Sequence, residues 1–290
     1  MPSHFVTRYM PPEQIIINGS TETFGIVGNP VRHSLSPVMH NAAFAALGMN
    51  CVYVPLLTSD LRKGVDGLKA LGFRGVSVTI PHKEEIVRYV EVLDPVAARI
   101  GAVNTLVIGK REHAADRTVY GYNTDWLGAN RALGEQIELA GSRVLLVGAG
   151  GSARAIGYGL LEAGAEIVLA NRTAARGQEL ADRLGCDFCP LDRIEAISAD
   201  VLVNTTSVGM TPGDHGTPVA QNLLPRFSVV MDIVYAPLAT RLLQEAASSG
   251  CKVVDGLSML LYQGVAQFEL WTGREAPVKV MRKVLQERIR

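Results

Sequence analysis

The stretch that decides the fold is residues 144–155, VLLVGAGGSARA. Its apolar start predicts a buried strand, which runs directly into a glycine-rich turn and then into a helix. Gly148 and Gly150 let the backbone approach phosphate groups, and Ala153 is small enough for the helix to pack closely on the strand. The free amides at the helix N-terminus face negative charge. We therefore expect a Rossmann-type dinucleotide site whose pyrophosphate is contacted by Gly148, Ala149, Gly150, Gly151 and Ser152.

The residues after the next strand, 166–170, indicate which dinucleotide binds. A site for NAD usually carries an acidic residue about 20 positions on, which binds the ribose 2′-hydroxyl. This chain has Asn171, Arg172 and Thr173 there instead. A guanidinium and two polar side chains suit a 2′-phosphate, and no carboxylate is present to repel it. The sequence predicts NADP, with Arg172 as a merely solvated residue at a strand end as the alternative.

Length and composition favour a two-domain protein without a general affinity for polyanions. A chain of 290 residues, 48% of them hydrophobic, is long enough for about two domains, each with its own hydrophobic core. Lys plus Arg and Asp plus Glu number 28 each, so the net charge is zero. Neither nucleic acid nor an anionic membrane is therefore an expected partner. No long apolar run or basic leader is present, and we expect a cytoplasmic location.

The four cysteines give no metal-binding pattern. Cys51 and Cys251 are isolated, and the pair Cys186 and Cys189 forms a single CxxC without a second pair of ligands. We interpret all four as reduced thiols and expect no metal site. A redox role for the CxxC pair is the alternative.

Strands and helices alternate along the chain, which predicts an α/β fold with a mostly parallel sheet. In the first part we expect strands at 24–28, 51–56, 75–80 and 103–108, and helices at 37–47, 61–71 and 81–90. Beyond the glycine-rich turn we expect strands at 201–204, 229–233 and 251–254, and C-terminal helices at 259–270 and 278–290.

This pattern divides the chain into three parts. They are an N-terminal substrate domain (1–124), a dinucleotide domain (125–256) and C-terminal helices that pack back on the first domain (257–290). The cleft between the domains is the expected place for chemistry. About 20 residues precede the first strand, and they are either a tail or an added edge strand.

A cluster of hydroxyls follows the first predicted strand. Ser36 before Pro37 predicts a helix N-cap. Capping does not explain Ser34, which lies on a loop beside the helix N-terminus, where two hydroxyls and free amides can hold a carboxylate. The capping and binding interpretations both remain open. His33 and His40 have no evident partner and are interpreted as structural or surface residues.

A second polar cluster contains Lys83. Pro81 predicts a helix start, which places Lys83 in the first turn, where the helix dipole disfavours a cation. The same field favours the neutral amine that acid/base catalysis needs, although a solvated lysine is the alternative. Asn104 and Asp125 also fall at strand ends or helix starts, the sheet edge where ligands bind. Asp125 alone could simply cap its helix.

Nine motifs between residues 24 and 263 carry a resemblance to the shikimate dehydrogenase family. In the family's order, they are GNPVRHSLSP, VTIPHKE, GAVNTL, GYNTD, GAGGSARA, NRT, NTTSVGM, DIVY and DGLSMLLYQG. The chain departs from the family at Ser152, where alanine is common.

The resemblance implies reversible NADPH-dependent reduction of 3-dehydroshikimate to shikimate, a step in aromatic amino-acid synthesis. It implies Lys83 as the acid/base residue, paired with Asp125. The other implied contacts are Ser34, Ser36 and Tyr235 to the substrate carboxylate, Thr79, Asn104, Asp125 and Gln263 around the ring hydroxyls, and Ile233 and Gly256 beside the nicotinamide.

Two other functions fit the same sequence. One is a quinate/shikimate dehydrogenase that uses NAD, against which the loop at Arg172 argues. The other is a non-catalytic regulator that binds NADP and a shikimate-like ligand, against which the presence of Lys83 and Asp125 argues. The sequence leaves a monomer and a homodimer open.

Overall fold

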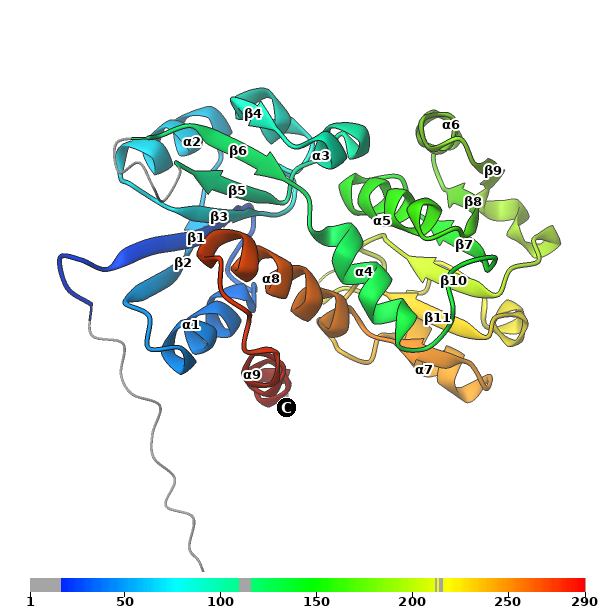
Figure 1. The fold of residues 1–290 in the computed structure, drawn as a ribbon. Coiled ribbons are helices and arrows are strands. Elements are labelled where there is room, and N and C mark those ends of the chain that lie inside the picture. The colour runs from blue at the N-terminus through cyan, green and yellow to red at the C-terminus, as the bar shows by residue number, and fades with distance from the viewer. Residues whose placement is uncertain (1–16, 110–115, 212, 214–215, 290) are drawn as a thin grey trace, which may run out of the picture.

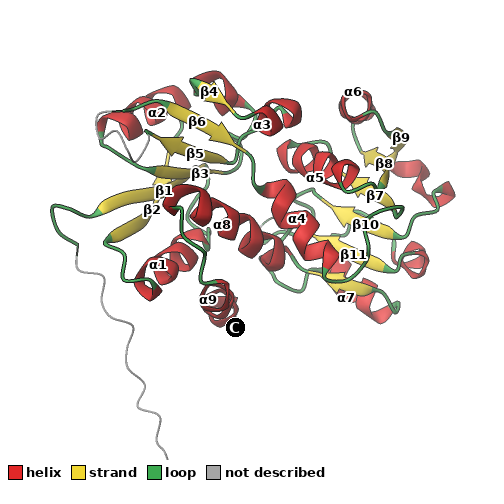
Figure 2. Ribbon diagram, viewed as in Figure 1, coloured by secondary structure: helices red, strands yellow, loops and turns green. Residues whose placement is uncertain are grey.

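The computed structural model describes residues 17–109, 116–211, 213 and 216–289. Within this part of the chain, two six-stranded sheets stand at opposite ends of the molecule, with helices α4 and α8 between them (Figures 1 and 2). Residues 1–16, which include most of the predicted tail or edge strand, lie outside the described residues, and a turn precedes the first strand.

The first sheet has the strand order β2-β1-β3-β5-β6-β4. Strand β5 is antiparallel to both neighbours, whereas the other described pairings in this sheet are parallel. Because β5 is reversed, its beginning lies at the same edge as the ends of β3 and β6. The strands are β1 (Glu22–Gly28), β2 (Cys51–Leu57), β3 (Gly75–Val78), β4 (Val92–Leu93), β5 (Thr105–Ile108) and β6 (Val119–Tyr122).

Two predictions in this half are corrected. Helix α1 (Ser36–Ala46) has Leu35 as its N-cap, so Ser36 is not the cap residue, and no side chain caps the helix. The predicted helix at 81–90 is a turn through residue 84 followed by the 3-10 helix η1 (Glu85–Tyr89). The carbonyl of Lys83 accepts from Val103 N at 2.8 Å, so a tertiary contact replaces the helical bond. The helix-dipole argument for Lys83 is therefore wrong. The remaining helices here are α2 (Leu61–Ala70) and α3 (Pro95–Ile100).

The second sheet is parallel at every described pairing, in the order β12-β11-β10-β7-β8-β9. Counted from β7 this is the 3-2-1-4-5-6 order of a Rossmann fold, with its crossover between β7 and β10. Its strands are β7 (Arg143–Val147), β8 (Glu166–Asn171), β9 (Asp187–Pro190), β10 (Val201–Asn204), β11 (Val229–Asp232) and β12 (Lys252–Val254). Its helices are α5 (Gly151–Glu162), α6 (Ala174–Leu184), η2 (Leu191–Ala196), η3 (Gln221–Arg226) and α7 (Arg241–Ser248).

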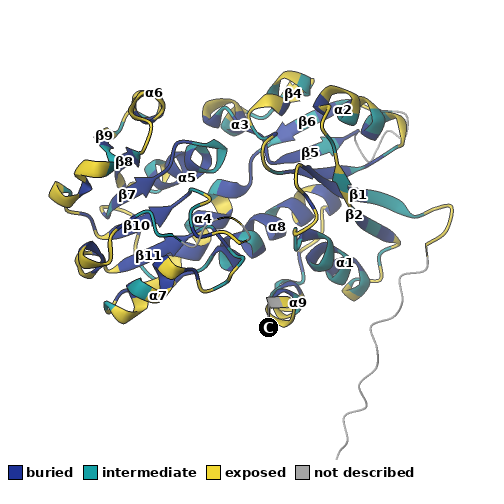
Figure 3. Ribbon diagram, turned by 180° about the vertical axis from the view of Figure 1, so that it is seen from behind, coloured by how far each residue is buried: buried dark blue, intermediate teal, exposed yellow. Residues whose placement is uncertain are grey.

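Strand β7 shows why the strands of this sheet are continuous apolar runs in the sequence. Leu146 belongs to the same buried cluster as Ile156 of α5, whereas its neighbour Leu145 belongs to the cluster of Leu242 on α7. Successive side chains thus enter cores on opposite faces, and both faces are covered. Figure 3 shows these strands buried and the outer helices partly exposed.

Helices α4 (Asp125–Gly134) and α8 (Gly256–Thr272) pack on each other between the two sheets. A Cβ added to Gly128 would lie 2.8 Å from both Gln263 N and Met259 O, so only glycine allows this approach. The last helix, α9 (Val278–Ile289), packs on α1. The C-terminal helices therefore return to the first half, as predicted.

Candidate active site

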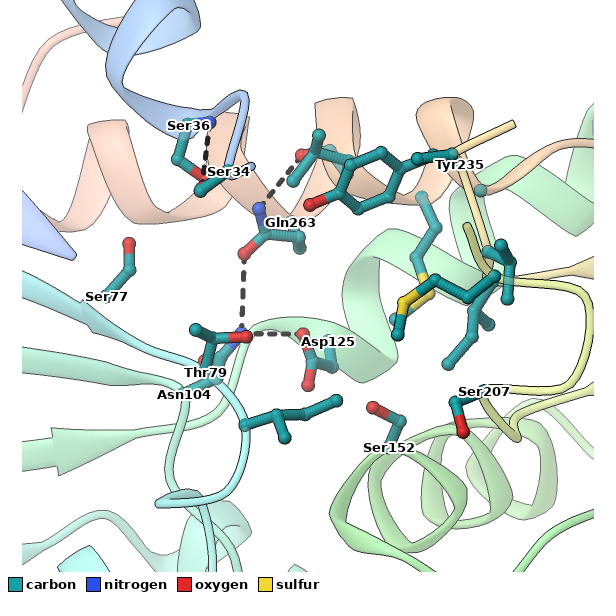
Figure 4. Close-up of a pocket in the computed structure, with 18 of the residues that line it drawn as sticks. Ser34, Ser36, Ser77, Thr79, Asn104, Asp125, Ser152, Ser207, Tyr235 and Gln263 are labelled. Atoms are coloured by element: carbon teal, nitrogen blue, oxygen red, sulfur yellow. Dashed lines mark hydrogen bonds between the residues drawn. The ribbon is translucent and has the colours of Figure 1, made fainter. Parts of the chain in front are cut away.

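A cavity of about 320 Å³ opens between the edges of the two sheets, with α8 along one side. Figure 4 shows polar side chains from both halves around it. All of the predicted substrate and catalytic residues, and some of the predicted cofactor residues, line this cavity. They are Ser34, Ser36, Thr79, Lys83, Asn104, Asp125, Ser152, Ile233, Tyr235, Gly256 and Gln263.

Lys83 and Asp125 form an ion pair on the cavity wall. The Lys83 Nζ lies 2.6 Å from Asp125 Oδ2, and the two side chains are only 15% and 4% exposed. Asp125 is the first residue of α4, and its amide donates to Asn123 Oδ1 at 3.0 Å. A Cβ added to Gly151 would lie 3.3 Å from Lys83 Cβ, so the glycine-rich turn lies directly against this lysine. The pair therefore holds an amine where the two halves meet.

Asn104 binds the other oxygen of the same carboxylate. Its Nδ2 donates to Asp125 Oδ1 at 2.8 Å, and its Oδ1 accepts from Thr124 N at 2.8 Å. Gln263 lies next to it at a longer distance, with 3.4 Å between Asn104 Nδ2 and Gln263 Oε1. Because a backbone amide only donates, the contact to Thr124 fixes which way the Asn104 amide faces. Both oxygens of Asp125 thus have a donor.

The hydroxyl-bearing side chains of Ser34, Ser36 and Tyr235 lie on the opposite side of the cavity from Asp125 (Figure 4). The Ser34 Oγ accepts from Ser36 N at 3.3 Å. The Ser36 hydroxyl is buried and does not cap the helix. Burial raises the pKa of Tyr235, so its hydroxyl keeps its proton and can donate. Donors beside the N-terminus of α1 suit a carboxylate group on a ligand. The cavity thus combines donors on one side with an ion pair on the other.

The glycine-rich turn occupies the crossover point of the second sheet. Gly148 has φ +118°, and a Cβ there would lie 2.3 Å from Thr205 Oγ1. Gly150 caps α5, and a Cβ there would meet no atom within 4 Å, so space above the turn is open. Ala153 is fully buried between helix and strand. This geometry fits a pyrophosphate on the helix N-terminus.

The predicted 2′-phosphate loop lies at the same edge, at the end of the neighbouring strand β8. Asn171 Nδ2 donates to Thr173 O at 2.8 Å, and Arg172 is exposed. These residues fit a phosphate group that lies away from the cavity. The predicted cofactor residues that do not line the cavity are Gly148, Ala149, Gly150, Gly151, Asn171, Arg172 and Thr173.

Several cavity residues were not among the predicted site residues. They include Ser77, Thr205, Thr206, Ser207, Met210, Met259 and Gln267. The run from Thr205 to Met210 had a usable signal, because polar residues directly follow a buried strand at the crossover point. Ser77 and Gln267 had none, since a serine inside a strand and a glutamine inside an apolar helix carry no local mark of a site.

A buried carboxylate orders the loops after β10 and β11. Asp232 accepts from Asn204 Nδ2 at 3.0 Å and from Thr240 Oγ1 at 2.7 Å. Asn204 in turn accepts from Thr206 Oγ1 at 2.7 Å. Burial raises the pKa of Asp232 to about 6, although these hydrogen bonds lower it. The network holds the part of the cavity wall that comes from the second sheet.

The cysteines and two of the histidines carry no evident chemistry. All four cysteines are free, and burial raises the pKa of Cys186 to about 11, which keeps its thiol protonated. His40 is buried and stacks on Tyr53, and burial lowers the pKa of His40 to about 3. His33 is exposed and lines the cavity. Within the described ranges, no group of three or more His, Cys, Asp or Glu side chains could hold a metal ion.

Family models match three consecutive parts of the chain. Residues 26–106 match the shikimate dehydrogenase substrate binding domain, 129–212 match shikimate / quinate 5-dehydrogenase, and 256–286 match the shikimate 5′-dehydrogenase C-terminal domain. A shikimate dehydrogenase (NADP(+)) from Moorella thermoacetica is 49% identical over 287 residues, which covers 94% of this chain and 95% of that protein. The chain belongs to the shikimate dehydrogenase family.

Solved shikimate dehydrogenases have the same fold. One, crystallised in complex with NADP⁺, has a TM-score of 0.87 at 39% identity and covers 95% of this chain and 98% of its own. The enzyme from Thermus thermophilus in complex with NADP(H) and shikimate has a TM-score of 0.83 at 38% identity, covering 92% and 99%. The predicted family and two-domain α/β fold are confirmed. Among the described residues, no helix has both the length and the apolar character to cross a membrane.

Proposed function

We propose that this member of the shikimate dehydrogenase family catalyses the reversible NADPH-linked reduction of 3-dehydroshikimate to shikimate, a step in aromatic amino-acid synthesis. The observation that carries the proposal is the ion pair between Lys83 and Asp125, with 2.6 Å between Nζ and Oδ2, on a cavity wall against the glycine-rich turn. The relative from Moorella, which is 49% identical and named for this activity with NADP⁺, supports it.

The hydroxyl side of the cavity is the proposed site for the substrate carboxylate. Ser34 and Ser36 lie at the start of α1, and Tyr235 lies across from them. Together they offer several donors to one carboxylate, which fixes the orientation of the ring. Thr79, Asn104 and Gln263 then surround the ring hydroxyls.

Lys83 is the proposed acid/base residue. NADPH, when bound, supplies a hydride to the carbonyl carbon at C3 of the substrate. As that carbon gains the hydride, the carbonyl oxygen gains negative charge, and the Lys83 ammonium donates a proton to it. Asp125 holds the amine in place, and in the reverse direction the neutral amine accepts the proton from the C3 hydroxyl.

The carboxyl edge of the second sheet is the proposed cofactor site. Residues 148–152 would hold the pyrophosphate, with open space above Gly150 and the N-terminus of α5 behind it. Asn171, Arg172 and Thr173 would hold the 2′-phosphate. Ile233 and Gly256, which both line the cavity, would border the nicotinamide.

The test is a spectrophotometric assay of NADPH oxidation with 3-dehydroshikimate. Parallel reactions with 3-dehydroquinate and with NADH separate the proposed enzyme from a quinate/shikimate dehydrogenase that uses NAD. A regulator would bind NADPH and shikimate in a calorimeter without turning over either. We expect turnover only in the reaction that contains both NADPH and 3-dehydroshikimate. Binding without turnover would contradict the proposal.

Three further properties are part of the proposal. The division into 1–124, 125–256 and 257–290 follows the two sheets and the returning helices, and limited proteolysis at the joints tests it. A cytoplasmic location is supported by four cysteines without a disulfide. Light scattering decides between the monomer and the homodimer.

A further inference from the structure

A line of buried polar groups runs along one wall of the cavity and ends on Asn104, with Ser77 and Gln267 among the lining residues. Tyr53 OH donates to Ser77 Oγ at 2.6 Å, and Ser77 Oγ donates to Gln267 Oε1 at 2.8 Å. Gln267 Nε2 then donates to Thr105 Oγ1 at 2.9 Å and to Asn104 O at 3.1 Å. Thr105 Oγ1 donates to Asn104 Oδ1 at 2.7 Å. Side chains from β2, β3, β5 and α8 thus form one connected network.

The chemistry of the groups fixes the direction of every bond in this network. The Asn104 carbonyl can only accept, so the Gln267 amide must turn its nitrogen toward β5 and its oxygen toward Ser77. That nitrogen has no lone pair to offer Thr105, so the Thr105 hydroxyl proton is left to point at Asn104 Oδ1. The Asn104 oxygen is held on the side away from Asp125.

We propose that Thr105 and Gln267 are positioning residues that, together with the Thr124 amide, hold the Asn104 side chain in place and, through it, the Asp125 carboxylate that holds Lys83. This inference rests on the proposed function. Thr105 is fully buried and does not line the cavity, so it acts on the reaction only through its neighbours, of which Asn104 Oδ1 is the nearest at 2.7 Å. The neighbouring Gln267 is 1% exposed.

The physical reason is the cost of a turned amide. If Asn104 turned over, its oxygen would face Asp125 Oδ1, and two acceptors would meet in a buried site where Asn104 is 2% exposed. The carboxylate would move or lose its second donor, and Lys83 would move with it. A displacement of a catalytic group by even about 1 Å lowers turnover strongly.

The experiment compares two substitutions at one buried position. Thr105→Val keeps the shape and removes the hydroxyl, whereas Thr105→Ser keeps the hydroxyl. We expect Thr105→Val to lower kcat for shikimate oxidation by about tenfold, the worth of one hydrogen bond, and Thr105→Ser to stay within about twofold of the original protein. The Kd for NADP⁺ is expected to stay unchanged in both, because the dinucleotide edge lies on the other sheet.

A matched control separates positioning from loose packing. Trp271 Nε1 donates to Leu106 O at 2.9 Å, at the same contact between α8 and β5 but away from the cavity. Trp271→Phe removes that buried bond, and we expect it to lower the melting temperature while kcat stays within about twofold. Gln267→Leu is the second test variant, with an expected loss in kcat of about tenfold or more and an unchanged Kd for NADP⁺.

The outcomes distinguish this inference from the proposed function. If the original protein does not turn over shikimate, the proposed function fails. If it does, equal kcat values for Thr105→Val and Thr105→Ser overturn the positioning role, as does a loss in Trp271→Phe as large as that in Gln267→Leu. Should Thr105→Val not fold, the comparison of Gln267→Leu with Trp271→Phe decides.

Discussion

The two sheet edges that face the cavity are built on different principles. At the first sheet the site consists of side chains, and Asn104, Asp125 and Lys83 hold one another by hydrogen bonds of 2.6–2.8 Å. At the second sheet the predicted site consists largely of backbone, with a glycine-rich turn and a helix N-terminus. A small ring with several hydroxyls can be oriented only by directed side chains, whereas phosphates need close backbone amides. The difference shows how one cavity can serve two unlike ligands.

The largest expected effect is on the side-chain edge. Lys83→Ala removes the proposed proton donor, and kcat should fall by roughly two to four orders of magnitude, the worth of a positioned acid/base group. Steady-state assays with NADPH and 3-dehydroshikimate measure it. Lys63→Ala, at a lysine whose side chain is 85% exposed on α2, is the control and should leave kcat unchanged. Near-normal turnover in Lys83→Ala would exclude this lysine from the proton transfer.

Asp232 differs from the backbone groups at the edge of the second sheet, because it is a buried carboxyl side chain that orders two loops. Its pKa is raised from 3.8 to about 6, so the folded protein binds a proton more tightly than the unfolded chain. The stabilisation by this proton is present below pH about 4 and is lost as the pH rises to about 6, at up to about 3 kcal/mol. Asp232→Asn should flatten that part of the profile of unfolding free energy against pH.

Urea unfolding between pH 4 and 7 measures this difference. The control is Asp192→Asn, at an exposed carboxylate of η2, which should leave the pH profile as it is. Parallel profiles for Asp232→Asn and the original protein would show that this carboxylate does not contribute to the pH dependence of the unfolding free energy.

Charge reversal at the end of β8 should change cofactor choice without touching the substrate edge. Arg172→Asp removes a guanidinium worth about 1.5–3 kcal/mol to a 2′-phosphate, so the preference for NADPH over NADH should fall by roughly 10- to 100-fold. The ratio of kcat/KM for the two cofactors measures it. The control is Arg193→Asp, at an exposed arginine of η2, the helix that follows β9, and it should leave the ratio unchanged. An unchanged ratio in Arg172→Asp would refute this loop as the phosphate site.

The smallest expected effect separates folding from binding within one turn. A Cβ at Gly150 meets no atom, so Gly150→Ala should fold normally, while its methyl group weakens NADP⁺ binding by about tenfold. Gly148→Ala should instead lower the melting temperature, because φ is +118° and Thr205 blocks the Cβ. Calorimetric Kd values and thermal melts measure the two effects. Tight binding by Gly150→Ala would contradict a pyrophosphate at this position.

Local patterns predicted the second half better than the first. The run of four apolar residues, the glycine turn and the helix after it are all decided by neighbours in sequence, and the structure has each of them in place. The turn that carries Lys83 could not be predicted in this way, because its carbonyl bonds to Val103, 20 residues away. Likewise Gln267 contacts Ser77 across 190 residues, so neither showed a local signal.

The sequence by itself determined the alternation of strands and helices, the family and the residue types that can do the chemistry, because these depend on short-range periodicity and motif order. Only the tertiary structure decided that β5 runs backward and that Asn104 and Lys83 share one carboxylate. Those facts depend on bonds between groups far apart in the chain. Such bonds form only when the strands of the first sheet and the start of α4 are assembled, so no short stretch of sequence contains them.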